Sequence, residues 1–193
     1  MNDTPSDTDD DISGTTDSKT EDIADETTVE DLPNTDVEVH THVHFGMTGS
    51  FPLRLAELFF ADDGLYIVEY GYITPLFGLG ARKHRRESEA MKSVYDHHGL
   101  DEVLVQGDSV TWLNYATVAQ VVLYDGGRLG RPKIAVYSES GSSHAYRLHG
   151  IEVFAELALD IETVCERYGI TVDRRAGVGF SPGESLRRFF NRE

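Results

Sequence analysis

The stretch from Val118 to Tyr168 begins with VAQVVLY (118–124), continues through KIAVY (133–137) and HAYRL (144–148), and ends in one long helical pattern. Apolar, β-branched runs such as these three predict strands, and the Gly- and Ser-rich segments between them predict turns. From 151 to 168 the apolar residues recur every three or four positions, which predicts an amphipathic helix ending at Gly169. Its apolar face consists of Phe154, Leu157, Ala158, Ile161, Val164, Cys165 and Tyr168. This order favours a small antiparallel barrel closed by a helix.

The first 36 residues differ in composition from the rest of the chain. They contain 13 acidic residues, a single basic residue, Lys19, and no aromatic residue. Such a segment buries too little apolar surface to offset its conformational entropy, so we predict a disordered acidic tail over 1–36. Most of the net charge of −17 belongs to this tail, because the other 157 residues carry 21 acids and 16 bases.

The whole chain is rich in acids and poor in lysine. Acidic residues outnumber basic ones by 34 to 17, and only four of the basic residues are lysines. This composition is similar to that of proteins from salt-accumulating halophiles. The N-terminal segment lacks the basic start and apolar centre of a signal peptide, and no apolar run is long enough to span a membrane. We therefore expect a cytoplasmic protein.

The segment after the tail alternates as a half-buried strand does. One face is expected to hold Val37, Val39, Thr41, Val43 and Phe45, and the other Glu38, His40, His42 and His44. Two further strands, at 53–60 and 65–74, flank the turn Ala61-Asp-Asp-Gly64. We expect Gly64 to take the left-handed conformation in this hairpin.

An insertion follows the third strand. The segment 75–99 is longer than a hairpin needs and contains a predicted helix from about Ser88 to His98. Residues 100–105 fit either a last helical turn or a short strand, whereas 109–113 predicts a strand. Beyond the long helix, 170–172 fits a short edge strand, and 173–193 predicts a linker and a short amphipathic helix opened by Ser181.

This order of elements resembles the pleckstrin-homology-like superfold, in particular its bacterial and GRAM-like branches. The resemblance rests on FADDGLYIV (60–68), NYATVAQVV (114–122) and the single amphipathic helix. It implies an α+β domain over 37–172: an antiparallel barrel or sandwich of about seven strands, capped by a C-terminal helix. Such a domain is a scaffold for binding. Lipid-binding members carry a basic loop between the first two strands, whereas the nearest short turn here is Ala61-Asp-Asp-Gly64.

Three histidines, His40, His42 and His44, form the first candidate site. On a regular strand, alternate residues point to the same side, and neighbouring imidazoles can share a metal that prefers nitrogen ligands, such as zinc, copper or nickel. Only Glu38 adds a carboxylate to this face. The alternative is that the histidines lie on the solvent face of an edge strand.

The second candidate is the basic run with the apolar residues that precede it. Its contact residues are Leu76, Phe77, Arg82, Lys83, Arg85 and Arg86. Apolar and basic residues side by side suit a protein partner or an anionic membrane surface. Nucleic acid fits less well, because the chain is acidic and no aromatic residues interleave with the run. The alternative is a solvated lead-in to the next helix.

In the predicted C-terminal helix, Phe189 and Phe190 form an apolar side that packs on the domain, a partner or a membrane. Cys165, the only cysteine, is expected to be buried and inert. No nucleophile, metalloprotease or nucleotide-binding motif is apparent, so we expect no enzyme activity and no cofactor. The sequence favours a non-enzymatic adaptor that works through protein contacts. The alternatives are peripheral membrane binding through 76–86 and a metal-binding protein or small metalloenzyme built on the three histidines.

Overall fold

The computed structural model describes residues 37–48, 53–73, 80–128, 130–150 and 154–177. The predicted acidic tail, Leu76, Phe77 and the predicted C-terminal helix with Phe189 and Phe190 lie outside these ranges.

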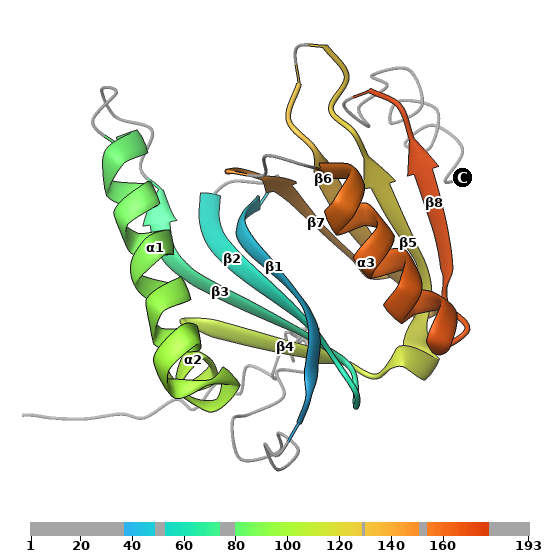
Figure 1. The fold of residues 1–193 in the computed structure, drawn as a ribbon, viewed down its shortest axis with the longest axis horizontal. Coiled ribbons are helices and arrows are strands. Elements are labelled where there is room, and N and C mark those ends of the chain that lie inside the picture. Colours follow the sequence, from blue (N-terminus) through green and yellow to red (C-terminus); the bar gives the residue numbers. More distant parts are fainter. Residues whose placement is uncertain (1–36, 49–52, 74–79, 129, 151–153, 178–193) are drawn as a thin grey trace, which may run out of the picture.

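Eight strands form one open, mixed sheet (Figure 1). They are β1 (Val39–Thr48), β2 (Leu53–Ala61), β3 (Leu65–Ile73), β4 (Ser109–Leu113), β5 (Val118–Tyr124), β6 (Lys133–Ser138), β7 (Ser143–Leu148) and β8 (Thr171–Arg175). Their order is β4-β3-β2-β1-β7-β6-β5-β8, with β4 and β8 at the edges.

The α+β class is confirmed, and the observed sheet differs from the predicted one in two respects: it is open, and β8 pairs with β5 in parallel although the other pairs are antiparallel. β8 itself lies close to the short edge strand predicted at 170–172. The connection explains the parallel pair. β5 and β7 are both antiparallel to β6 and therefore run in the same direction. β7 and β8 are joined through a helix, and strands joined by such a crossover also run in the same direction, so β8 is parallel to β5.

In the described part of the chain, three α-helices pack against the sheet: α1 (Gly80–His98), α2 (Leu100–Gln106) and α3 (Phe154–Arg167). α1 and α2 lie on one side of β1–β4, and α3 lies on the other side, close to β5 and β8 (Figure 1). A short 3-10 helix, η2 (Tyr115–Thr117), joins β4 to β5. Within the predicted insertion, the helix expected from about Ser88 begins earlier, at Gly80, and residues 100–106 continue the helical segment as α2. Residues 75–79 lie outside the described part of the chain.

Two hydrophobic cores lie on opposite faces of β1–β3. The first combines β2 and β3 with β5–β7 and with the apolar face of α3, including the fully buried Ile161 and Cys165. The second lies between these strands and the helices α1 and α2. β2 is buried on both faces, since Leu58 belongs to the first core and Phe59 to the second. The predicted apolar face of α3 is confirmed.

Two irregularities in β1 change the faces of its side chains. Val39 pairs with Ala61 and Thr41 with Phe60, so β1 advances two residues while β2 advances one. A second shift lies between Val43 and Gly46, where Phe45 has a φ of 58°. Such bulges reverse the alternation that follows them. The predicted division of 37–45 into two regular faces is therefore wrong.

The hairpin between β2 and β3 forms as predicted, but Gly64 has a different role. Gly64 is not among the glycines with positive φ in the described chain. A Cβ atom at this position would lie 2.6 Å from Trp112 Nε1 and 2.7 Å from the Leu113 carbonyl oxygen. The turn needs glycine because β4 passes too close for a side chain.

Among the described residues, no helix is both long enough and apolar enough to cross a membrane.

Candidate metal centre

The site is built around Glu57, a carboxylate in the middle of β2. Its side chain has an exposed fraction of 0 %, and its neighbours on the strand are apolar. β2 turns Glu57 toward α1, on the same face as Leu55 and Phe59. A buried carboxylate is costly unless donors surround it.

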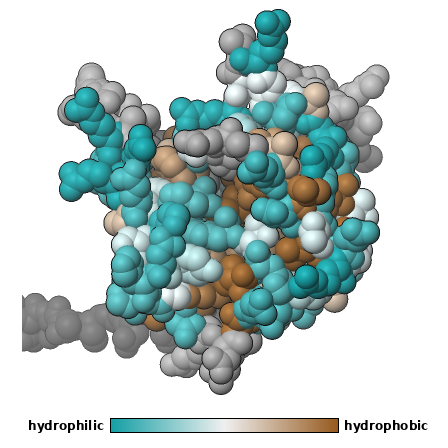
Figure 2. All heavy atoms as spheres, in the orientation of Figure 1, coloured by the Kyte–Doolittle hydropathy of each residue, from teal (hydrophilic) through white to brown (hydrophobic). Residues whose placement is uncertain are grey.

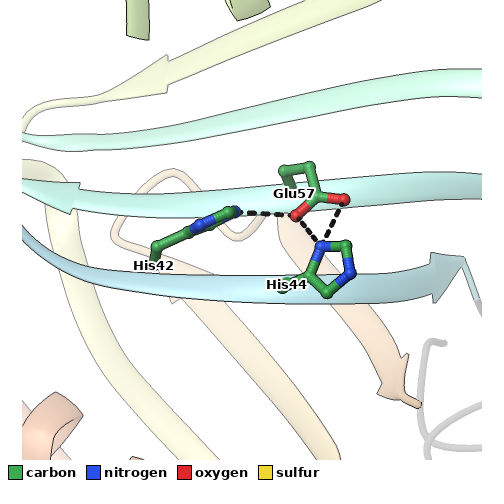
Figure 3. A group of neighbouring side chains, drawn as sticks. All are labelled: His42, His44 and Glu57. Atoms are coloured by element: carbon green, nitrogen blue, oxygen red, sulfur yellow. Dashed lines mark hydrogen bonds and ion pairs between the residues drawn. The ribbon is translucent and has the colours of Figure 1, made fainter. Parts of the chain in front are cut away.

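Two histidines of β1 reach this carboxylate from the adjacent strand (Figure 3). His42 Nε2 lies 2.7 Å from Glu57 Oε2, and His44 Nδ1 lies 2.9 Å from the same oxygen and 3.1 Å from Oε1. The three possible ligand atoms all lie within 4.8 Å of one another. His42 and His44 are two residues apart on β1, so their side chains lie on the same face. Because β1 pairs with β2, both can reach Glu57 on that face.

Each member of the cluster has a further partner that fixes its orientation. The Tyr70 hydroxyl donates a hydrogen bond of 2.5 Å to Glu57 Oε1, and His44 Nε2 lies 3.1 Å from the Ser88 hydroxyl on α1. The His42 ring stacks on Phe59, with centroids 4.3 Å apart, and meets the edge of Tyr95 at 4.7 Å. The site thus joins β1, β2, β3 and α1.

The electrostatics favour an ionised Glu57. Burial alone would raise its pKa, but the hydrogen bonds and the electrostatic attraction from His42 and His44 outweigh burial, so the pKa of Glu57 lies below its ordinary value. Burial and the adjacent Glu57 carboxylate raise the pKa of Tyr70, which stays protonated and donates. The centre therefore presents one carboxylate and two imidazoles to a common point.

These three groups are a suitable ligand set for a transition metal. Zinc in catalytic sites uses three protein ligands of this kind and keeps a further position open, and two histidines with one carboxylate also suit ferrous iron. Outer partners of the Tyr70 and Ser88 type orient metal ligands. The side chains of His42 and His44 are 13 % and 27 % exposed, so both histidines are partly accessible to solvent.

His40 does not belong to this site. The bulge at the start of β1 directs it toward the end of α3, where its Nε2 lies 3.3 Å from the Tyr168 hydroxyl. Glu38 is exposed and is not part of the cluster. The prediction of an edge strand is also wrong, since β1 lies between β2 and β7. The predicted trio of histidines is replaced by His42, His44 and Glu57.

The basic run lies within α1 and is not a lead-in to the helix. Arg82, Lys83, Arg85 and Arg86 are exposed, and Figure 2 shows a mainly hydrophilic surface over this helix. Lys83 pairs with Glu87 at 3.4 Å and Arg85 with Glu89 at 2.8 Å. Helical i,i+4 pairs of this type support the early start of α1.

Cys165 is buried in α3, as predicted. Burial, with a smaller contribution from Glu162, raises the pKa of its thiol to about 12. A thiol with this pKa remains protonated and unreactive near neutral pH.

Sequence reasoning missed Glu57, although its context contains a signal. Glu57 is the only acid in LRLAELFFA, the segment that forms β2. Charged residues are almost never fully buried unless they are paired, so an acid inside an apolar strand indicates a partner elsewhere in the chain. Which partner it meets depends on the register between β1 and β2.

No protein-family model matches this chain, and no curated protein matches it.

Proposed function

We propose that the protein binds a divalent transition metal ion through His42 Nε2, His44 Nδ1 and a carboxylate oxygen of Glu57. The observation that carries this proposal is the convergence of these atoms within 4.8 Å in a centre whose carboxylate is fully buried. Tyr70 holds Glu57 Oε1, while Oε2 is the oxygen that lies nearest to both histidines. Ser88 holds the far nitrogen of His44 and leaves Nδ1 toward the same point.

Zinc is the first ion to test, because the ligand set is nitrogen-rich and contains no thiolate. Three protein ligands leave at least one position for water or a small ligand. This arrangement supports a metal-binding protein and the small metalloenzyme among the alternatives from the sequence.

The test compares two histidines of the same strand. The metal-free protein is prepared with a chelator, zinc is added, and bound zinc is measured after dialysis for the wild type, His44→Ala and His40→Ala. We expect His44→Ala to bind one equivalent less than the wild type and His40→Ala to bind the same amount. Equal losses in both variants, or no loss in His44→Ala, would contradict the proposal.

The scaffold is a separate proposal. We infer a PH-like arrangement from the order β4-β3-β2-β1-β7-β6-β5 and from the helix α3, whose apolar face packs in the core shared by both groups of strands. Such scaffolds are typical of binding modules. The adaptor function through 75–98 and membrane attachment through 76–86 remain predictions, and affinity capture and vesicle flotation respectively would test them.

A further inference from the structure

A second group of polar atoms on α1 is buried without hydrogen-bond partners among the described residues. His84 is 5 % exposed, and neither its Nδ1 nor its Nε2 forms a hydrogen bond with any residue in the described ranges. Glu87 Oε2, one helical turn further along, is likewise buried with no such bond in this part of the chain. His84 Nδ1 and Glu87 Oε2 lie 3.6 Å apart. The metal centre described above uses neither residue.

These atoms are costly to bury as they stand. An unsatisfied buried polar group costs about 1–3 kcal/mol, and such a group in a native structure calls for a physical explanation, of which ion binding is one. At His84 and Glu87 the two atoms are too far apart for a hydrogen bond.

Their separation fits a bridging metal ion. Zinc–nitrogen and zinc–oxygen bonds are about 2.0–2.2 Å long, so two ligands of a tetrahedral ion lie roughly 3.4 Å apart. The observed 3.6 Å is close to this value. Residues at i and i+3 share one face of a helix, and therefore both side chains can reach the same ion.

The chemistry of the pair favours a cation. A neutral imidazole nitrogen and a carboxylate oxygen both donate electron pairs, whereas an anion would be repelled by Glu87. Lys83 Nζ lies 3.4 Å from the other Glu87 oxygen, Oε1, and thus orients the carboxylate from outside. Ser88, which contacts His44, follows Glu87 directly in α1, so one helix connects both positions.

We propose that His84 and Glu87 form a second binding position for a transition metal ion, completed by water or a small ligand. This proposal goes beyond the proposed function and does not depend on it, because the two positions share no ligand. With only two protein ligands, the second position is expected to bind more weakly than the first.

The test measures zinc binding to the metal-free full-length chain by titration calorimetry. The wild type is compared with His84→Phe and with His98→Phe, which replaces an exposed histidine of the same helix. We expect His84→Phe to lose the weaker equivalent and to keep the tighter one, whereas His98→Phe keeps both. Because His84→Phe removes two unpartnered nitrogens, its metal-free form should melt no lower than the wild type.

Glu87→Gln gives an independent variant at a half-buried position and should lower the zinc affinity of this weaker equivalent by about tenfold or more.

The outcomes separate the two proposals. Loss of zinc in His44→Ala alone supports the first position and overturns the second, and loss in His84→Phe alone does the reverse. Unchanged zinc binding in both His84→Phe and Glu87→Gln would show that the pair is a buried ion pair and no metal position.

Discussion

At the scale of a single residue, the proposed metal binding depends most on Glu57. Its carboxylate is fully buried and accepts hydrogen bonds from Tyr70, His42 and His44. An acid in this setting is stabilised only while its donors remain in place. The same donors place the oxygens and nitrogens where a metal ion can bind them.

We expect Glu57→Gln to abolish metal binding at the first position and to destabilise the metal-free protein by about 2 kcal/mol. The amide keeps the shape of the side chain but places a donor against the donors of the histidines. Zinc dialysis and urea unfolding measure the two effects. Glu89→Gln, at an exposed ion pair of α1, is the control and should change stability by less than about 0.5 kcal/mol. Equal effects of both substitutions would contradict the role assigned to Glu57.

His149 makes stability depend on pH. Burial, with Arg131 and Arg147 nearby, lowers its pKa from 6.5 to about 4. Between these values the unfolded chain binds a proton that the folded chain does not, so stability is full above pH 6.5 and decreases as the pH falls toward 4. The ring is only half buried, and solvent screening reduces this contribution to roughly 1 kcal/mol.

His149→Gln should therefore flatten the dependence of unfolding free energy on pH between 6.5 and 4. Urea unfolding at a series of pH values measures this, with His98→Gln on the surface of α1 as the control. A His149→Gln profile parallel to that of the wild type would show that this histidine is not responsible.

At the scale of elements, β1 and the β2–β3 hairpin position the site. The bulges in β1 separate His40 from His42 and His44. The hairpin holds β3, and with it Tyr70, in register beside β2, where Leu55 pairs with Tyr70. The close approach of β4 at Gly64 belongs to the same hairpin.

Gly64→Ala should destabilise the protein by about 1–3 kcal/mol, because the added methyl group would meet Trp112 and the Leu113 backbone. Gly141→Ala is the matched control: Gly141 has a φ of 88° and no atom within 4 Å of a Cβ, so only backbone strain opposes the change. Thermal unfolding compares the two. A smaller loss at Gly64 than at Gly141 would contradict the steric explanation.

At the scale of the whole molecule, β1, β2 and β3 link the two cores. α3 packs in the first core, while the metal centre lies on the face covered by α1 and α2. Since the same strands form both cores, loss of α3 packing should also disrupt the metal centre on the opposite face.

Ile161→Asp should unfold the domain, with a loss of more than about 4 kcal/mol, because it places an unpaired charge at a fully buried position. Zinc binding at the first position should be lost with the fold, although Ile161 contacts no ligand. Leu159→Asp, on the exposed side of the same helix at 60 % exposure, is the control and should leave both unchanged. Circular dichroism and zinc dialysis measure the outcome. A folded Ile161→Asp protein with intact zinc binding would show that the two cores are independent.

The sequence by itself determined most elements, because local hydrophobic patterns and turn residues specify them. The strands at 109–113 and 118–124 and the apolar face of α3 are found as predicted. The start of α1 was harder to predict, because a basic run without apolar residues has no amphipathic pattern. The sequence of α2 is ambiguous for a similar reason, since a short apolar segment fits a helix or a strand.

Only the tertiary structure decided the composition of the site. A regular strand would group His40, His42 and His44, but the bulge before Thr41 separates the first from the other two. Glu57 joins His42 and His44 through pairing between β1 and β2, and His84 is buried because α1 packs on the sheet. These relations depend on register and on packing between distant segments, which no local pattern in the chain encodes.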